Sequence, residues 1–255
     1  MELERIEIVE DRTAASRCDE GFLRVSRLLL RNVYADGSAS VAYACDVVSR
    51  PGSDAVVAVL YQVEGKGGGR RVRVLLREGV RAPVYLRRHK NFVHPDPREY
   101  RELAEVVAGI VEPDDPPGEA GLRRRAALEA EEEAGCQLGP EAFEPIGGET
   151  FASPGVSDEK VYYRAAAAAL DRAQEPSGDG SAMEEYAHLV VCDLDEAIER
   201  CRTGAIPDMK TEVALLRLAD HLGYLPQLGC FADELPAELR ARHRRLGVEP
   251  PPAAT

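Results

Sequence analysis

The sequence predicts an α/β fold preceded by a short antiparallel β subdomain. Three observations lead to this prediction: strand-like runs dominate the first 80 residues, an acidic helix spans residues 118–136, and an amphipathic helix follows at residues 211–225. With 255 residues, of which 44% are hydrophobic, the chain is long enough to bury one substantial core. We therefore expect a globular protein with one main domain.

The N-terminal runs either alternate apolar and polar residues or are rich in β-branched and aromatic residues, as strands are. They cover residues 4–9, 23–34 and 39–48, and Asp36-Gly37 supplies a hairpin turn between the last two. These strands have too few apolar residues to form a core of their own. We expect them to pack on the main domain or on another subunit. Two further strands are predicted at residues 55–63 and 71–78.

Charge and composition limit the classes of partner. The formal net charge of −13 argues against a nucleic acid as the main partner, because binding to phosphate backbones is driven by Lys and Arg. The chain is charged from its second residue and has no apolar run near the roughly 20 residues that span a bilayer, so we expect no signal peptide, no membrane partner and a cytoplasmic location. The six cysteines include no Cys-x-x-Cys pair and are expected to be reduced thiols.

The acidic helix carries the strongest chemical signal. Three of its carboxylates share one helical face at spacings i, i+3 and i+4: Glu129, Glu132 and Glu133. A small apolar stripe lies on another face, formed by Ala126, Ala130 and Ala134. Gly135 follows and predicts the helix end. Clustered carboxylates repel one another unless a cation holds them, and their oxygens suit Mg²⁺ or Mn²⁺. The alternative is a solvated acidic surface.

Residues 105–136 resemble the Nudix box, in which a glycine and a glutamate precede Arg-Glu-apolar-x-Glu-Glu-x-Gly-apolar. Here Gly109 opens the pattern, Glu119 is the early glutamate, and Leu128-Glu129-Ala130-Glu131-Glu132-Glu133-Ala134-Gly135-Cys136 closes it. The loop after Gly109 is longer than in the family, and Leu128 replaces the arginine that orients the metal-binding glutamates. Arg125 lies one helical turn before Glu129, so its guanidinium is a candidate for that orienting role.

Two further segments resemble the ADP-sugar branch of the family. Arg81, after the strand at 71–78, stands where an arginine reaches the substrate diphosphate. Residues 103–109 resemble the Glu-x-Pro-Ala-Gly element, with Val107 in place of its proline. The resemblance makes Glu105 a substrate-binding residue and the carbonyl of Ala108 a metal ligand. For Arg81, an ordinary surface arginine is the alternative.

The segment after the acidic helix resembles the same branch more specifically than the box does. It reads Ser-Pro-Gly followed by Ser-Asp-Glu, and the resemblance assigns substrate binding to Ser153, Gly155 and Glu159. A loop at residues 174–183 then ends in two glutamates. Of these, Glu185 matches the family's base or additional metal ligand better, and Glu184 is the reserve.

The resemblance implies a Nudix α/β/α sandwich with a mixed sheet. It divides the chain into a β subdomain at 1–50 that forms a homodimer interface, a Nudix domain at 51–225 and a partly disordered tail at 226–255. The implied activity is metal-dependent hydrolysis of a nucleoside diphosphate sugar such as ADP-ribose, giving a nucleoside monophosphate and a sugar phosphate. Leu128, Val107 and the long box loop favour the alternative, a catalytically impaired Nudix-fold protein that binds nucleotide sugars or regulates.

Overall fold

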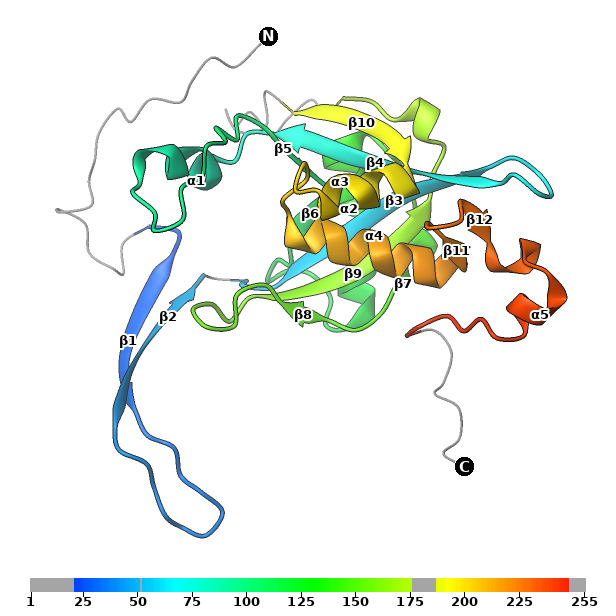
Figure 1. Cartoon of the computed structure of the whole chain (residues 1–255). Helices are drawn as coiled ribbons and strands as arrows, with labels where there is room; N and C mark the ends of the chain where they lie inside the picture. Colours follow the sequence, from blue (N-terminus) through cyan, green and yellow to red (C-terminus); the bar gives the residue numbers. More distant parts are fainter. Residues whose placement is uncertain (1–20, 51, 176–186, 248–255) are drawn as a thin grey trace.

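The computed structural model describes residues 21–50, 52–175 and 187–247. Within these ranges a mixed sheet of eight strands forms the centre of the molecule (Figure 1). Its strands are β3 (Ala55–Glu64), β4 (Arg71–Gly79), β5 (Leu103–Glu105), β6 (Val107–Ile110), β7 (Glu144–Pro145), β8 (Thr150–Phe151), β9 (Lys160–Ala167) and β10 (His188–Asp193). The path through the sheet is β10-β4-β3-β9-β7.

Strand β3 lies in the middle of the sheet, and the six residues 55–60 are buried. A continuous apolar run of this kind is typical of a strand that is covered on both faces. β3 pairs in parallel with β9 and antiparallel with β4, although the β3–β4 pairing covers only residues 61–64 and 71–74. Beyond that point the two strands are separated.

The segment 103–110 lies next to both separated strands. β5 pairs with the end of β4, where Glu105 is opposite Arg77, and β6 pairs with the start of β3, where Gly109 is opposite Val56. Val106, which belongs to neither strand, is the crossover point. One short segment therefore brings the predicted metal and substrate residues to the junction of β3 and β4.

Helices cover both faces of the sheet. α2 (Glu119–Ala134) packs on one face, and α3 (Leu194–Arg202) and α4 (Met209–Leu222) pack on the other (Figure 1). The predicted stripe of Ala126, Ala130 and Ala134 is fully buried against the sheet. Three layers and two apolar cores result. This confirms the predicted mixed α/β architecture.

The helix ends follow from local chemistry. α2 ends at Gly135, which has the left-handed φ of 61° that glycine adopts without strain. α4 begins after Asp208, whose side chain accepts a hydrogen bond from the backbone N of Thr211 at 2.9 Å. On α4, Leu215 and Leu218 are fully buried in the core predicted for this helix.

The shorter elements lie around this framework. They are α1 (Ala82–Tyr85), α5 (Ala237–Arg240), the 3-10 turns η1 (Leu86–His89), η2 (Pro140–Ala142), η3 (Leu170–Arg172) and η4 (Ala232–Glu234), and the strand pair β11 (Tyr224–Leu225) and β12 (Cys230–Phe231). α5 is four residues long and lies in the C-terminal segment that begins at residue 226. Within the described ranges, no helix has the length and apolar character needed to cross a membrane.

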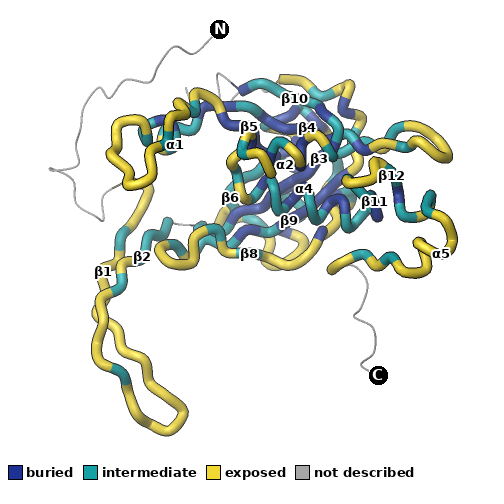
Figure 2. The backbone as a smooth tube through the Cα atoms, viewed as in Figure 1, coloured by how far each residue is buried: buried dark blue, intermediate teal, exposed yellow. Residues whose placement is uncertain are grey.

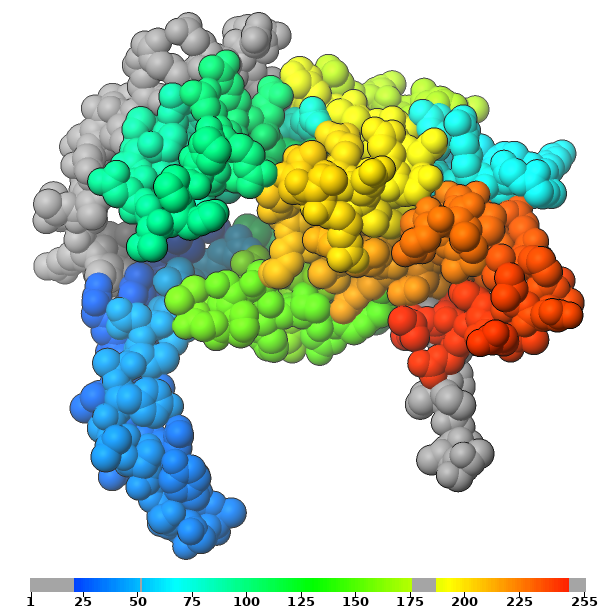
Figure 3. Space-filling model, in the orientation of Figure 1, coloured from blue at the N-terminus to red at the C-terminus, as the bar shows by residue number. Residues whose placement is uncertain are grey.

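The N-terminal hairpin projects from the main body, as the space-filling view shows (Figure 3). It pairs β1 (Arg24–Leu30) with β2 (Tyr43–Ser49), and its turn includes Asp36-Gly37 as predicted. Most of its length is exposed (Figure 2). The exposed large apolar side chains are Phe22, Leu23, Leu28, Leu29, Leu30, Val33, Tyr34, Val41 and Tyr43. The strand predicted at 4–9 lies outside the described residues.

Candidate functional site

The site is built where α2 crosses β6. Glu129 lies directly over Gly109: a Cβ added to that glycine would be 1.8 Å from the Glu129 carboxylate. The φ of Gly109 is not in the left-handed region, so the backbone conformation does not require glycine here. The close approach of the carboxylate does. Gly109 is therefore a glycine because Glu129 occupies the space of its side chain.

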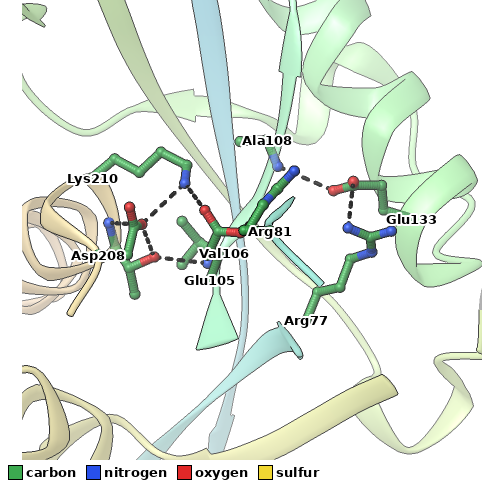
Figure 4. A network of polar contacts seen from close by, with 9 residues as sticks. Arg77, Arg81, Glu105, Val106, Ala108, Glu133, Asp208 and Lys210 are labelled. Carbon is green, nitrogen blue, oxygen red and sulfur yellow. Dashed lines mark hydrogen bonds and ion pairs between the residues drawn. The ribbon is translucent and has the colours of Figure 1, made fainter. Parts of the chain in front are cut away.

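Glu133, one turn further along α2, is held from two sides. Its Oε2 accepts a hydrogen bond from the backbone N of Ala108 at 3.3 Å, and its Oε1 lies 3.3 Å from Nη1 of Arg77 on β4 (Figure 4). The Glu133 side chain is largely buried, as is that of Arg77. One carboxylate thus joins the helix to β4 and β6.

Arg125 contacts Glu129 as an ion pair at 3.7 Å, which is longer than a hydrogen bond. Its Nε donates to Asp115 at 2.9 Å, and Arg124 pairs with the same carboxylate. Only 1% of the Asp115 side chain is exposed, and burial alone would raise the pKa of this carboxyl. The hydrogen bonds from Arg125 and from the backbone N of Glu112 outweigh burial and lower the pKa. The loop between β6 and α2 therefore supplies the carboxylate that fixes Arg125.

Glu132, the third predicted glutamate, is exposed on α2. In the described part of the chain, no three His, Cys, Asp or Glu side chains are gathered as they would be around a bound metal. Two features nevertheless suit a divalent cation: the donors are hard carboxylate oxygens, and Gly109 leaves the space in which Glu129 approaches the backbone of β6. Glu119, the predicted early glutamate, binds Arg164 of β9, with Nε–Oε1 at 3.1 Å.

A second group of ion pairs joins Arg81 to the start of α4 (Figure 4). Arg81 and Lys210 each contact one oxygen of Glu105, and Lys210 also lies 3.1 Å from Asp208. Burial raises the pKa of Glu105, but the charges of Lys210 and Arg81 outweigh it and lower the pKa. Because both of its oxygens have partners inside the protein, Glu105 positions Arg81, whose side chain is still 41% exposed.

The Ser-Pro-Gly segment lies at the start of β9 and contacts the hairpin. The carbonyl of Ser153 accepts hydrogen bonds that close the turn, from the backbone N of Val156 at 3.0 Å and that of Ser157 at 2.9 Å. The carbonyl of Val156 accepts from the backbone N of Val48 on β2 at 2.8 Å. Gly155 lines a cavity of about 320 Å³ between this loop and the hairpin.

Glu159, at the end of the same segment, pairs with Arg50 at 3.0 Å. β9 and β6 both pair with the first residues of β3, so this segment leaves the sheet at the same end as Gly109. The structure therefore brings the predicted substrate residues to one end of the sheet. Polar contacts from this segment, however, run to the hairpin base: Val156 bonds Val48, Asp158 bonds Ser49 and Glu159 pairs with Arg50. Glu184 and Glu185 lie outside the described residues.

Sequence reasoning missed Arg77, Asp115 and Lys210. For Arg77 a signal existed, because it is an arginine at the end of an apolar strand, on the face of the buried Leu75. No sequence signal pointed to Asp115 or Lys210. Asp115 contacts Arg125 across a loop, and Lys210 contacts Glu105, which is distant in the sequence.

A search of protein-family models finds no match to this chain, and a search of curated proteins finds none either. The fold and the geometry above are therefore the evidence on which function is argued.

Proposed function

We propose that the chain is a Nudix-type hydrolase that cleaves the diphosphate bond of a nucleoside diphosphate sugar such as ADP-ribose. One observation carries the proposal: α2 brings Glu129 and Glu133 against Ala108 and Gly109, with the glycine leaving the space for a carboxylate. A surface acidic helix would not need this arrangement, because solvated carboxylates point away from the protein.

In this proposal Glu129, Glu132, Glu133 and the carbonyl of Ala108 hold Mg²⁺, or Mn²⁺ in its place. When bound, the ion would neutralise charge on the diphosphate and lower the pKa of the attacking water. Water adds to one phosphorus, and the bond from that phosphorus to the bridging oxygen breaks. The products are a nucleoside monophosphate and a sugar phosphate. Glu185 is proposed to accept the proton from the water.

The chain's own residues would bind the substrate before the reaction. Arg81 is half-exposed and anchored by Glu105, so its remaining N–H donors are available to a diphosphate. Ser153, Gly155 and Glu159 lie at the end of the sheet to which Gly109 also belongs. We assign them to the sugar side of the substrate or to its nucleoside.

The proposed assembly is a homodimer. A two-stranded ribbon is marginally stable alone in water, and this hairpin exposes nine large apolar side chains over its length. An exposed apolar surface of this kind favours an interface. A second copy of the chain would cover it without requiring another partner.

A binding or regulatory protein is the second candidate. It is favoured by Leu128 and by Glu129 and Glu133, each of which forms an ion pair with an arginine. Such a protein would hold a nucleotide sugar and release it unchanged.

The test is to incubate the purified chain with ADP-ribose, ADP-glucose, UDP-glucose or GDP-mannose, with and without Mg²⁺, and to identify products by phosphorus NMR. We expect metal-dependent release of two monophosphates and loss of this activity in Glu133→Gln. Glu131→Gln is the matched control, because Glu131 is an exposed neighbour on the same helix. Binding without turnover would favour the second candidate, and full activity in excess chelator would exclude the metal mechanism.

A further inference from the structure

Arg77 is a charged side chain that is buried in the central sheet. Along β4, Val74 and Leu76 join the core beneath α3 and α4, whereas Leu75 joins the core beneath α2. By the alternation of a strand, Arg77 shares the face of Leu75 and points toward α2, where it meets Glu133 (Figure 4). Only 7% of Arg77 is exposed. A guanidinium therefore occupies an apolar layer.

This burial is not explained by stability. Nε of Arg77 is buried and has no hydrogen-bond partner among the described residues. Leaving such a donor unpaired costs about 1–3 kcal/mol, and replacing a buried ion pair by apolar side chains is often neutral or stabilising. Apolar side chains at both positions 77 and 133 would avoid these costs, whereas a leucine at 77 alone would leave the buried Glu133 carboxylate without its ion pair. The arginine must then serve Glu133 rather than the core.

The contact fixes the orientation of one carboxylate. Arg77 lies at Oε1 of Glu133, and the Ala108 amide donates to Oε2, so the carboxylate plane is held from two directions. Arg125, the helix residue nearest to this role by sequence, is bound first to Asp115 and reaches only Glu129. Arg77 thus forms an ion pair with Glu133 at 3.3 Å, and the charge of Arg81 also acts on Glu133.

We propose that Arg77 is a positioning residue that acts from β4 in place of the helix arginine replaced by Leu128, and that it orients Glu133 toward a divalent cation. This inference rests on the proposed function for the identity of the cation site, but it concerns metal binding and not turnover. Residues that orient metal ligands typically change metal affinity by about 10- to 100-fold when they are removed.

The experiment measures binding of Mn²⁺ to the full chain by electron paramagnetic resonance, without substrate. We expect Arg77→Leu to weaken Mn²⁺ binding by about 10- to 100-fold at a temperature at which circular dichroism shows the variant to be folded, because removal of one partner of a buried ion pair also lowers the melting temperature. Arg77→Lys keeps the charge but loses the planar fork, and it should give an intermediate affinity. The control is Arg73→Leu, because Arg73 lies four residues earlier on the same strand face and pairs with Glu64 instead.

A double-mutant cycle tests whether Arg77 acts through Glu133. In a Glu133→Gln background, Arg77→Leu should cause no further loss of Mn²⁺ affinity, since the group that it orients is already altered. Unchanged or tighter Mn²⁺ binding in Arg77→Leu would overturn the inference. So would additive effects of the two substitutions in the cycle. A wild-type chain that binds no Mn²⁺ would overturn it as well. If Arg77→Leu does not fold, the comparison of Arg77→Lys with wild type decides in the same way.

The two proposals fail separately. A wild-type chain that binds Mn²⁺ in an Arg77-dependent manner but hydrolyses no nucleotide sugar would remove the proposed function and leave this inference standing. If the chain hydrolyses a nucleotide sugar with metal but its Mn²⁺ affinity does not depend on Arg77, the proposed function stands and this inference is removed.

Discussion

Replacing Gly109 with alanine tests the central feature of the site. The new Cβ would be 1.8 Å from Cδ and Oε1 of Glu129 and 2.5 Å from its Cγ. Ordinary van der Waals contact begins near 3.4 Å, so the carboxylate must move by about 1.6 Å. Misplacing a reacting group by about 1 Å can reduce rates on the order of a hundredfold. We therefore expect Gly109→Ala to lower the rate of ADP-ribose hydrolysis by at least about 100-fold.

The same substitution should hardly change stability. The clash is with the end of a flexible side chain, and an off-rotamer Glu129 costs about 0.5–1.5 kcal/mol. Alanine restricts the unfolded chain more than glycine does, which stabilises the folded state by about 0.4–1 kcal/mol. This gain offsets part of the rotamer cost. For a chain of this size, each kcal/mol of stability corresponds to about 2–4 °C in melting temperature. The melting temperature should therefore change by only a few degrees.

The assay compares initial rates with thermal unfolding followed by circular dichroism. Gly68→Ala is the control, because a Cβ at Gly68 meets no atom within 4 Å and its φ is not in the left-handed region. A loss of rate below tenfold in Gly109→Ala, or a loss that follows unfolding, would refute the reasoning. Either result would mean that hydrolysis does not depend on the position of the Glu129 carboxylate next to β6.

Three further predictions concern the framework and the assembly. Thr211→Val removes the hydroxyl that accepts a hydrogen bond from the buried Val106 amide at 3.0 Å. We expect the free energy of unfolding, measured by urea denaturation, to fall by about 1–3 kcal/mol. Thr211→Ser keeps the hydroxyl and should retain most of the stability. The folded pKa of Glu105 lies below its ordinary 4.5, so its ion pairs contribute fully above that pH and are lost as pH falls through the lowered pKa. The melting-temperature gap between wild type and Glu105→Gln should therefore shrink as the pH falls below 4.5, and a gap independent of pH would contradict this. Leu29→Asp places a charge in the exposed apolar surface of the hairpin that the proposed dimer would bury. Light scattering should therefore show a dimer for the wild type and a monomer for the variant. A monomeric wild type would exclude the proposed dimer.

The fold could be predicted largely because its signals are local. The alternation of residues 71–78 became β4 (Arg71–Gly79), and Gly135 ended α2 through its own backbone preference. The N-terminal hairpin was also predicted, but it was expected to pack on the main domain or on another subunit, whereas in the structure most of it projects and is exposed. The short strands β7 and β8 were missed because two residues are too few for a period to be recognised.

The site was less predictable because its partners come together only in three dimensions. Helical spacing placed Glu129 and Glu133 on one face, but it could not show that Gly109 gives way to the first and Arg77 binds the second. Spacing also treated Glu132 as their equal, whereas it is exposed. The role of Glu105 depends on Lys210, which is 105 residues away in the chain. Long-range ion pairs of this kind leave no periodic trace in a sequence.

The crossover of segment 103–110 also provides two spectroscopic reporters. The amide of Val106 donates to the hydroxyl of Thr211 on α4, and the amide of Ala108 donates to Glu133 on α2. Both protons are therefore held by side chains from helices on opposite faces of the sheet. Hydrogen exchange at Val106 should report the detachment of α4, whereas the amide nitrogen and proton frequencies of Ala108 should shift when the carboxylate of Glu133 changes partner. A single short segment would thus allow the two helical layers of the molecule to be followed separately in one spectrum.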